Sequence, residues 1–429
     1  MPIDLTVAGE ASRYPEHGPR LLPWLAIWLI CCGIGAAGAL LLWPESAPAA
    51  GPKFWFCAVG VPNLVFAIVL GIDRAGFEAL WIRAACRNQL RSRWLADKVA
   101  QAQRPLQVLG IGYSLPLGGD DLNAVMEAAR PLVRAQAPRR GSGVIPHNRF
   151  DEDAVTLLPA PDEDAFGIPA DESEDSHVDK TEAVATITLK IVEALGPLCA
   201  SVHALSQYGP EYAPAVRVLA TPDVAAARVL QVGEAMRRSG LPELECLAEP
   251  AAHGFMVIDG WLDAGEHRPL LIIATVWHDS EPPEGSAEGC VAVLLNPGAY
   301  QLPEPVRVGG LLHRPVAGKT DALDALLKLA LIWGGTESAA VRRAWITGVG
   351  GQQAIALLSA WKAAALEHLT DNDGKLRPDR IVGDAGFLNP WLSVAAAIAS
   401  GKEGPQLLVD AAQAVVLHVT TSPHDDSIQ

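Results

Sequence analysis

Two long apolar runs open the chain, at residues 21–43 and 54–72, and neither contains a charged side chain. Each is long enough to cross ~30 Å of hydrocarbon as a helix. One such run alone could be a buried core helix. Two in tandem, joined by the short loop 44–53, favour a transmembrane hairpin. A cleavable signal peptide is not expected, because the first run starts late and no small-residue cleavage site precedes a soluble segment.

Basic residues around these runs predict their orientation. The connecting loop holds only Lys53, and the N-terminal segment 1–20 holds Arg13 and Arg20. Six more follow the second run: Arg74, Arg83, Arg87, Arg91, Arg93 and Lys98. Positive charge on short flanks stays cytoplasmic. Both termini and the large C-terminal part are therefore expected in the cytoplasm, beneath a bacterial inner membrane.

Residues 73–104 are predicted to form a basic helical stalk. Arg83, Arg87 and Arg91 recur every fourth residue and so share one helix face. Such a face suits the anionic head groups of membrane lipids. A merely solvated helix face is the alternative.

From residue 105 the pattern becomes that of an α/β fold. Short runs rich in Val and Ile, such as 270–276 and 289–296, alternate with Ala- and Leu-rich helical stretches. Fully apolar strands between helices predict a sheet covered on both faces. Residues 151–182 differ, with 12 acidic residues against Lys180, and are expected to form a solvated insertion. The tail 421–429 is expected to be disordered.

Charge and cysteine content narrow the function. The formal net charge of −16 argues against nucleic-acid binding, which needs a basic footprint. The seven cysteines show no CxxC or metal-ligand spacing, so no metal or cofactor is predicted.

The stretch VLGIGYSLPLG, at 108–118, excludes several nucleotide and hydrolase motifs. A dinucleotide fingerprint would place its third glycine where Leu115 stands. A hydrolase elbow around Ser114 would need glycine in place of Pro116. A phosphate loop of the GxxxxGK[ST] type does not occur anywhere in the chain.

The same stretch resembles the first strand and turn of the β-ketoacyl synthases, which commonly open with V-T-G-x-G-x-x-S-P-L-G. The likeness continues in GSGVIPHNRFD at 141–151, EGCVAVLLNP at 288–297 and GDAGFLNPWLSVAAAIA at 383–399. It spans roughly 105–420. The resemblance implies a thiolase-like fold with αβαβα layers, carrying the acidic stretch as an insertion.

The residues that carry out condensation in that family are not found. Its cysteine nucleophile belongs in the window 247–261, and its two histidines belong in 345–353 and 383–393. The first window has no cysteine and the other two have no histidine. No catalytic residue is therefore predicted, and the chain is not expected to be an enzyme. His253 and His313 are interpreted as structural.

The resemblance also implies partners. Thiolase-like proteins typically dimerise through a strand of their first half, and Leu270, Ile272, Ala274 and Val276 are the candidate strand, unless it is central in a monomer. The partner would be a second copy or another ketosynthase-like protein.

Membrane-anchored, inactive ketosynthase-like architectures resemble proteins encoded near type VI secretion effectors. This implies an adaptor for a secreted effector or spike protein. A chain-length-factor-like partner remains open, as does a divergent acyl-processing enzyme of fatty-acid or polyketide metabolism using Cys199 or Cys246.

Overall fold

The computed structural model describes residues 5–16, 21–44, 51–159, 181–319, 322–370 and 374–420. The chain divides into two compact units, Ile3–Ala100 and, from Gln101 onward, the remainder. The predicted tail 421–429 and most of the predicted acidic insertion lie outside the described residues.

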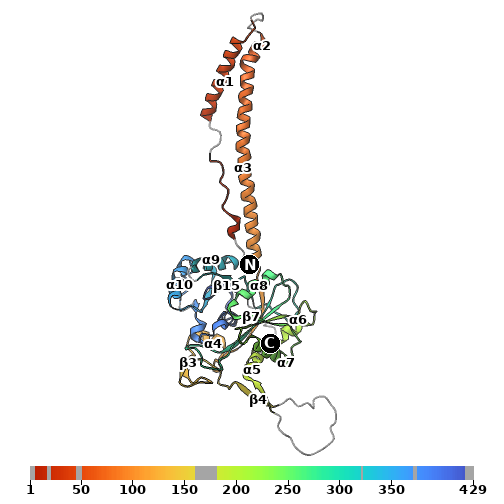
Figure 1. Ribbon diagram of the computed structural model, residues 1–429, viewed down its shortest axis with the longest axis vertical. Helices are drawn as coiled ribbons and strands as arrows, with labels where there is room; N and C mark the ends of the chain where they lie inside the picture. The colour runs from red at the N-terminus through yellow and green to blue at the C-terminus, as the bar shows by residue number, and fades with distance from the viewer. Residues whose placement is uncertain are drawn as a thin grey trace, which may run out of the picture. The chain divides into compact units, whose positions relative to one another are not determined.

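The N-terminal unit is a helical hairpin (Figure 1). Helix α1 (Leu21–Leu41) runs beside a continuous helical rod made of α2 (Pro52–Trp55), the π-helical segment η2 (Phe56–Gly60) and α3 (Val61–Ala102). The predicted second span and the predicted stalk thus form one helix. A short 3-10 turn, η1 (Leu5–Ala8), precedes them.

Small and polar residues let the two helices pack closely. A Cβ on Gly35 would lie 1.9 Å from Cγ of Pro62, so only glycine fits there. Nearby, the Trp28 indole donates a hydrogen bond of 2.8 Å to Oδ1 of Asn63.

The segments Leu22–Leu41 and Pro52–Ala102 are both long and apolar enough to cross a membrane. Thr186–Ser206 meets the same criteria, but it contributes Ile187, Ile191 and other side chains to the core of the second unit.

The second unit is built on an 11-stranded sheet in two halves. The first half has the order β7-β6-β8-β9-β1 and the second β10-β15-β14-β12-β13, with β11 pairing β15. The first-half strands are β1 (Leu106–Ser114), β6 (Ala215–Ala220), β7 (Cys246–Pro250), β8 (Leu270–Val276) and β9 (Gly289–Asn296). The others are β10 (Gly310–Leu312), β11 (Val316–Ala317), β12 (Arg343–Thr347), β13 (Lys375–Leu376), β14 (Gly404–Asp410) and β15 (Gln413–Val419).

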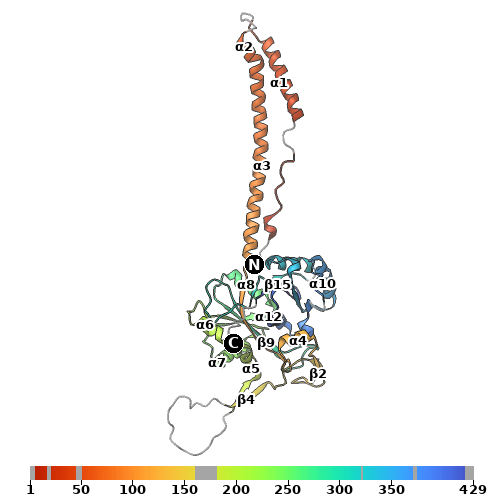
Figure 2. The ribbon, with the colours of Figure 1, turned by 180° about the vertical axis from the view of Figure 1, so that it is seen from behind.

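Helices lie between the halves and outside them (Figures 1 and 2). The main core cluster joins α4 (Leu122–Ala128), α8 (Met256–Ala264) and α12 (Asn389–Ala399) to inward-facing strand residues. On the outer face of the first half, α5 (Thr186–Leu195), α6 (Cys199–Ser206) and α7 (Ala225–Arg238) form a second cluster. Helix α9 (Leu323–Trp333) packs on β15 and against α10 (Gly351–Ala363). Smaller elements complete the unit: α11 (Pro378–Ile381), η4 (Gly196–Leu198), η5 (Ala251–His253), η6 (Ser338–Ala340), η7 (Gly386–Leu388), and the hairpins β2 (Arg134–Gln136) with β3 (Ile145–His147) and β4 (Val155–Pro159) with β5 (Thr181–Ala185).

The dimer-strand prediction for Leu270, Ile272, Ala274 and Val276 is wrong. These residues lie on β8, which pairs with β6 on one side and β9 on the other. A strand that is hydrogen-bonded on both sides has no free edge with which to extend a sheet. The fully apolar sequence of β8 reflects its central position, where both faces are covered.

The glycines of the G-I-G motif serve packing. A Cβ on Gly112 would lie 1.9 Å from the carbonyl oxygen of Ala194, at the end of α5. A Cβ on Gly110 would lie 2.6 Å from Cδ2 of Leu198. Strand β1 therefore needs both glycines so that α5 and η4 can approach its backbone.

We expect Gly112→Ala to lower the free energy of unfolding by about 1–3 kcal/mol, because a backbone carbonyl must move to admit the methyl group. Gly196→Ala is the matched control, since a Cβ there meets nothing within 4 Å. Chemical denaturation of the full chain measures both. Equal stability of the two variants would contradict the close approach at β1.

Candidate functional site

Three separate sequence windows meet at one cavity of about 280 Å³. They are the windows in which the ketosynthase resemblance places the nucleophile and the two histidines. The β14–β15 turn supplies a fourth wall. The lining residues are Ala251, Ala252, Gly254, Gly348, Asp384, Gly386, Phe387, Asn389, Pro390, Asp410 and Gln413. The structure thus brings together the expected site regions, with different side chains in them.

A single glutamine ties the first window to the β14–β15 turn. Oε1 of Gln413 accepts a 2.8 Å hydrogen bond from the backbone N–H of Phe255, and its Nε2 donates to the carbonyl of His253 at 3.1 Å. Gly254 between them has φ +51°, and a Cβ there would lie 2.8 Å from the same Oε1. The turn that leads into α8 is therefore held against the opposite half of the sheet.

Asp384 organises the third window. Its Oδ1 accepts hydrogen bonds from the backbone N–H of Gly386 at 2.9 Å and from Nδ2 of Asn389 at 2.7 Å. Asn389 in turn accepts from the backbone N–H of Ala385 at 3.0 Å. These bonds satisfy polar groups at the start of η7 and α12, and they present a carboxylate to the cavity.

Asp410 is the most perturbed acid of the cavity. Burial raises the pKa of its carboxyl to about 6. The Thr347 hydroxyl, which donates to Oδ1 at 2.8 Å, works against that rise, while the charges of Asp379 and Asp384 add to it. Gly348, at φ +64°, passes so close that a Cβ would lie 2.9 Å from Oδ1. The cavity is therefore acidic, with one carboxyl that changes protonation near pH 6.

Neither a thiol nor an imidazole lines this cavity. The one histidine of the three windows, His253, directs its Nδ1 to Oε1 of Glu249 at 2.5 Å and lines a different cavity. Among the described residues, His, Cys, Asp and Glu side chains do not form a cluster of three or more that could hold a metal ion.

The two candidate thiols also lie outside the cavity lining. Cys246 begins β7, and burial raises its pKa to about 11. Cys199 begins α6; burial raises its pKa too, and its Sγ lies 3.4 Å from the carbonyl of Leu195. Thiolates are the reactive form, so both environments disfavour nucleophilic chemistry at neutral pH.

His313 occupies a structural position, as expected. Its Nδ1 lies 3.2 Å from the carbonyl of Gln103, and its ring centroid is 4.9 Å from that of His418. Burial, assisted by the neighbouring His418, lowers the pKa of His313 to about 4. The imidazole is therefore neutral at physiological pH.

The proposed membrane-surface arginines all lie on α3 in the N-terminal unit. Arg83 and Arg87 are exposed. Arg91 is partly covered, because its Nε donates a 2.9 Å hydrogen bond to the carbonyl of Gly9. The segment before α1 therefore engages one of the three cations, and the other two face outward.

Comparison with solved structures identifies the fold. A ketosynthase domain, OzmH KS7 of Streptomyces albus JA3453, aligns with a TM-score of 0.50 and 11% identity over 76% of each chain. The second unit has the fold of ketosynthases. The peroxisomal 3-ketoacyl-CoA thiolase of Saccharomyces cerevisiae, a five-layered α-β-α-β-α structure, aligns at 0.44 with 10% identity over 74% of this chain and 98% of its own. At such identities the comparison concerns the fold alone, and the predicted fold class is confirmed. Neither a family model nor a curated protein matches the sequence.

Sequence reasoning missed Asp410 and Gln413. Both belong to the turn of LLVDAAQAVV, where polar residues interrupt an otherwise apolar hairpin. Ala411 between them has φ +47°, as a tight turn requires. These polar residues were the signal that could have identified the turn. Between two core strands, a polar residue is expected only where the turn reaches solvent or lines a site.

We expect Asp410→Asn to stabilise the protein at pH 8 by about 2–3 kcal/mol, since a pKa raised by two units costs about that much once the acid ionises. The folded pKa lies above the unfolded one, so the cost grows between about pH 4 and pH 6 and is absent below pH 4. Chemical denaturation at pH 8 and pH 4 measures the difference. Asp120→Asn, at an exposed carboxyl, is the control; an equal gain at both pH values would contradict the assignment.

Proposed function

We propose that this chain is a membrane-anchored, catalytically inactive ketosynthase-like protein that acts as an accessory or adaptor. The observation that carries the proposal is the cavity at the meeting point of the three windows, which presents Asp384, Asp410 and Gln413 and no thiol or imidazole.

The charge of that cavity opposes condensation chemistry. Forming a carbon–carbon bond from a malonyl thioester needs a nucleophile to hold one acyl group and hydrogen-bond donors to stabilise the developing enolate. Carboxylates at the same place repel both the substrate's carboxylate and the enolate. The cavity is better suited to a neutral or cationic group of a partner, such as a lysine side chain.

The N-terminal hairpin would supply the membrane anchor. Its two apolar helices satisfy the length requirement for spanning. With Lys53 as the one basic residue of the predicted loop and a basic α3 beyond it, both termini would lie in the cytoplasm of a bacterial inner membrane. Arg83 and Arg87 would then contact anionic lipid head groups.

A second copy, or another ketosynthase-like chain, would pair along β7. This strand ends the first half of the sheet, with β6 on its other side. The Glu245 carbonyl accepts from the backbone N–H of Val216, so by alternation the backbone groups of Cys246 and Ala248 point away from β6. Pro250, which lacks an N–H, falls in the same outward register.

The cargo would be a type VI secretion effector or spike protein, as the resemblance of the architecture implies. Glu152 and Glu182 pair with Lys190 and Arg238, and the other acidic residues of 151–182 would engage a basic patch on that cargo, an arrangement that favours fast and selective encounter. A second candidate is an acyl-processing enzyme, and Asp410 supports it, because a carboxyl with a pKa of about 6 can act as a general acid or base near neutral pH. A chain-length-factor-like role would require a ketosynthase partner.

Affinity capture of the full chain from native membranes, followed by mass spectrometry, tests the adaptor role. We expect a secreted effector or spike component to co-purify, with recovery that falls at high salt and on deletion of 160–180. Recovery of fatty-acid or polyketide enzymes without any secreted cargo would contradict the proposal and favour the enzymatic or chain-length-factor alternatives.

The same capture with two differently tagged copies tests the β7 edge. Ala248→Pro removes an outward N–H and should abolish recovery of the second copy or of a ketosynthase-like partner. Ala248→Val keeps the N–H and should leave recovery unchanged. Equal recovery with the proline variant would place the contact elsewhere.

A further inference from the structure

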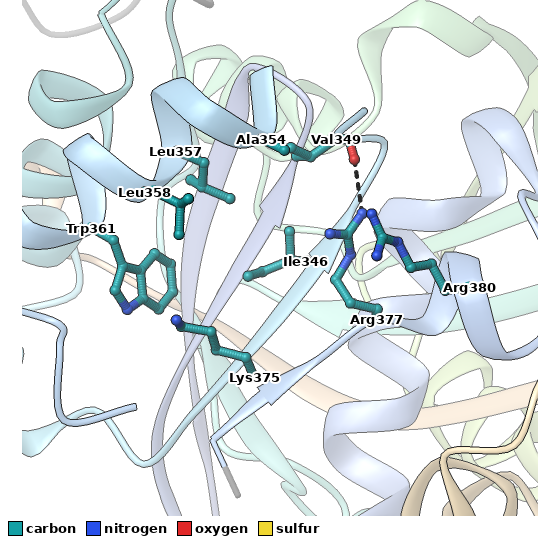
Figure 3. Close-up of a pocket in the computed structure, with 9 residues that line it drawn as sticks. All are labelled: Ile346, Val349, Ala354, Leu357, Leu358, Trp361, Lys375, Arg377 and Arg380. Atoms are coloured by element: carbon teal, nitrogen blue, oxygen red, sulfur yellow. Dashed lines mark hydrogen bonds between the residues drawn. The ribbon is translucent and has the colours of Figure 1, made fainter. Parts of the chain in front are cut away.

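A second cavity, of about 380 Å³, lies on the other side of β12 from the core and is formed by β12, α10, β13 and α11 (Figure 3). Its lining combines apolar side chains of β12 and α10 with three basic residues, Lys375, Arg377 and Arg380. Its volume falls within the usual range of small-molecule sites, about 300–1,000 Å³. The proposed adaptor function makes no use of it.

One part of this cavity is apolar. Leu357 and Trp361 are buried, with 7% and 4% of their surface exposed. Ile346 lines the cavity from β12. Leu358, one residue along α10, is 67% exposed at the mouth. A helix whose leucine remains exposed beside an apolar cavity presents surface that an alkyl chain would cover.

The other part is basic. Lys375 extends its ammonium over the Trp361 ring, 5.1 Å from the centroid. Arg377 donates to the carbonyl of Val349 at 2.8 Å and pairs with Asp379 at 3.3 Å. Asp379 also accepts from the backbone N–H of Gly348, so its charge is already shared.

Arg380 differs from Arg377, because its charge is not balanced by a carboxylate that the structure describes. Its guanidinium lines the cavity and is exposed, and it has neither a hydrogen bond nor an ion pair with any side chain that the structure describes. Among the residues that the structure describes, Arg377 is paired with Asp379, and the charge of Arg380 faces the cavity beside Lys375. Like charges gathered at the end of an apolar cavity are stabilised by an anion placed between them.

We propose that this cavity binds a single-chain amphiphilic anion. Its alkyl chain lies along Leu357, Leu358 and Trp361, and its carboxylate or phosphate head group is held by Arg380. Arginine favours such groups, because its planar fork matches their paired oxygens. A free fatty acid and a phosphomonoester lipid share this chemistry.

Photo-crosslinking tests the proposal on the full chain in phosphatidylcholine nanodiscs. The probe is decanoate carrying a diazirine on its alkyl chain, and the crosslinked peptides are mapped by mass spectrometry. We expect saturable labelling within residues 346–380. Decanoate or decyl phosphate should compete at least tenfold better than decanol or decyltrimethylammonium, and the better of the two anions identifies the head group.

Variants separate the two halves of the site. Arg380→Glu should lower labelling at least fivefold through the head group, and Leu358→Asp should do so through the chain. Both positions are exposed, so the fold should tolerate either change. Arg307→Glu, at an exposed arginine outside the cavity, should label like the wild type. Unsaturable or dispersed labelling, equal competition by the cation, or full labelling of Arg380→Glu would each overturn the proposal.

Discussion

The burial of helix α12 over its first nine residues is the constraint on which the second unit depends. Every residue from Asn389 to Ala397 is buried. Small side chains at Ser393 and Ala395–Ala397 let both halves of the sheet approach the helix, while Trp391 packs edge-on against Phe255 at 5.9 Å. A helix apolar on all sides can exist in water only inside such a sandwich. Packing around α12 therefore locks the two halves together.

Because of this constraint, the positions of the cavity walls do not depend on which reactive side chains line the cavity. The start of α12 and the turn into α8 are positioned by core contacts and by backbone hydrogen bonds to Asp384, Asn389 and Gln413. These contacts position the walls without a thiol or an imidazole. A partly buried and partly repelled carboxyl such as Asp410 costs stability when it ionises, and residues with that property concentrate at functional sites. Retention of an acidic cavity on this scaffold favours recognition over condensation.

The local patterns predicted the fold well and the arrangement of strands less well. The run 108–118 and the fully apolar strands identified a covered α/β sheet, because burial on both faces leaves a direct mark on composition. The position of β8 within the sheet was missed, since hydrogen-bond partners distant in sequence decide whether a strand is central.

The three windows of the site were found in order along the chain. Asp410 and Gln413 were not, because they reach the cavity from a turn that only the tertiary structure brings there. Arg380 and Trp361, 19 residues apart, likewise meet only in the folded unit.

The central claim is that the chain keeps a ketosynthase-like scaffold for its shape and binding surfaces, without the condensing reaction. The most direct test incubates the purified full chain with malonyl and acyl thioesters. Turnover is measured as release of CO₂, and acylated cysteines are detected by mass spectrometry. The account predicts neither CO₂ release nor a stable acyl adduct at Cys199, Cys246 or any other thiol. Catalytic decarboxylation or condensation, with acylation of one cysteine, would contradict it.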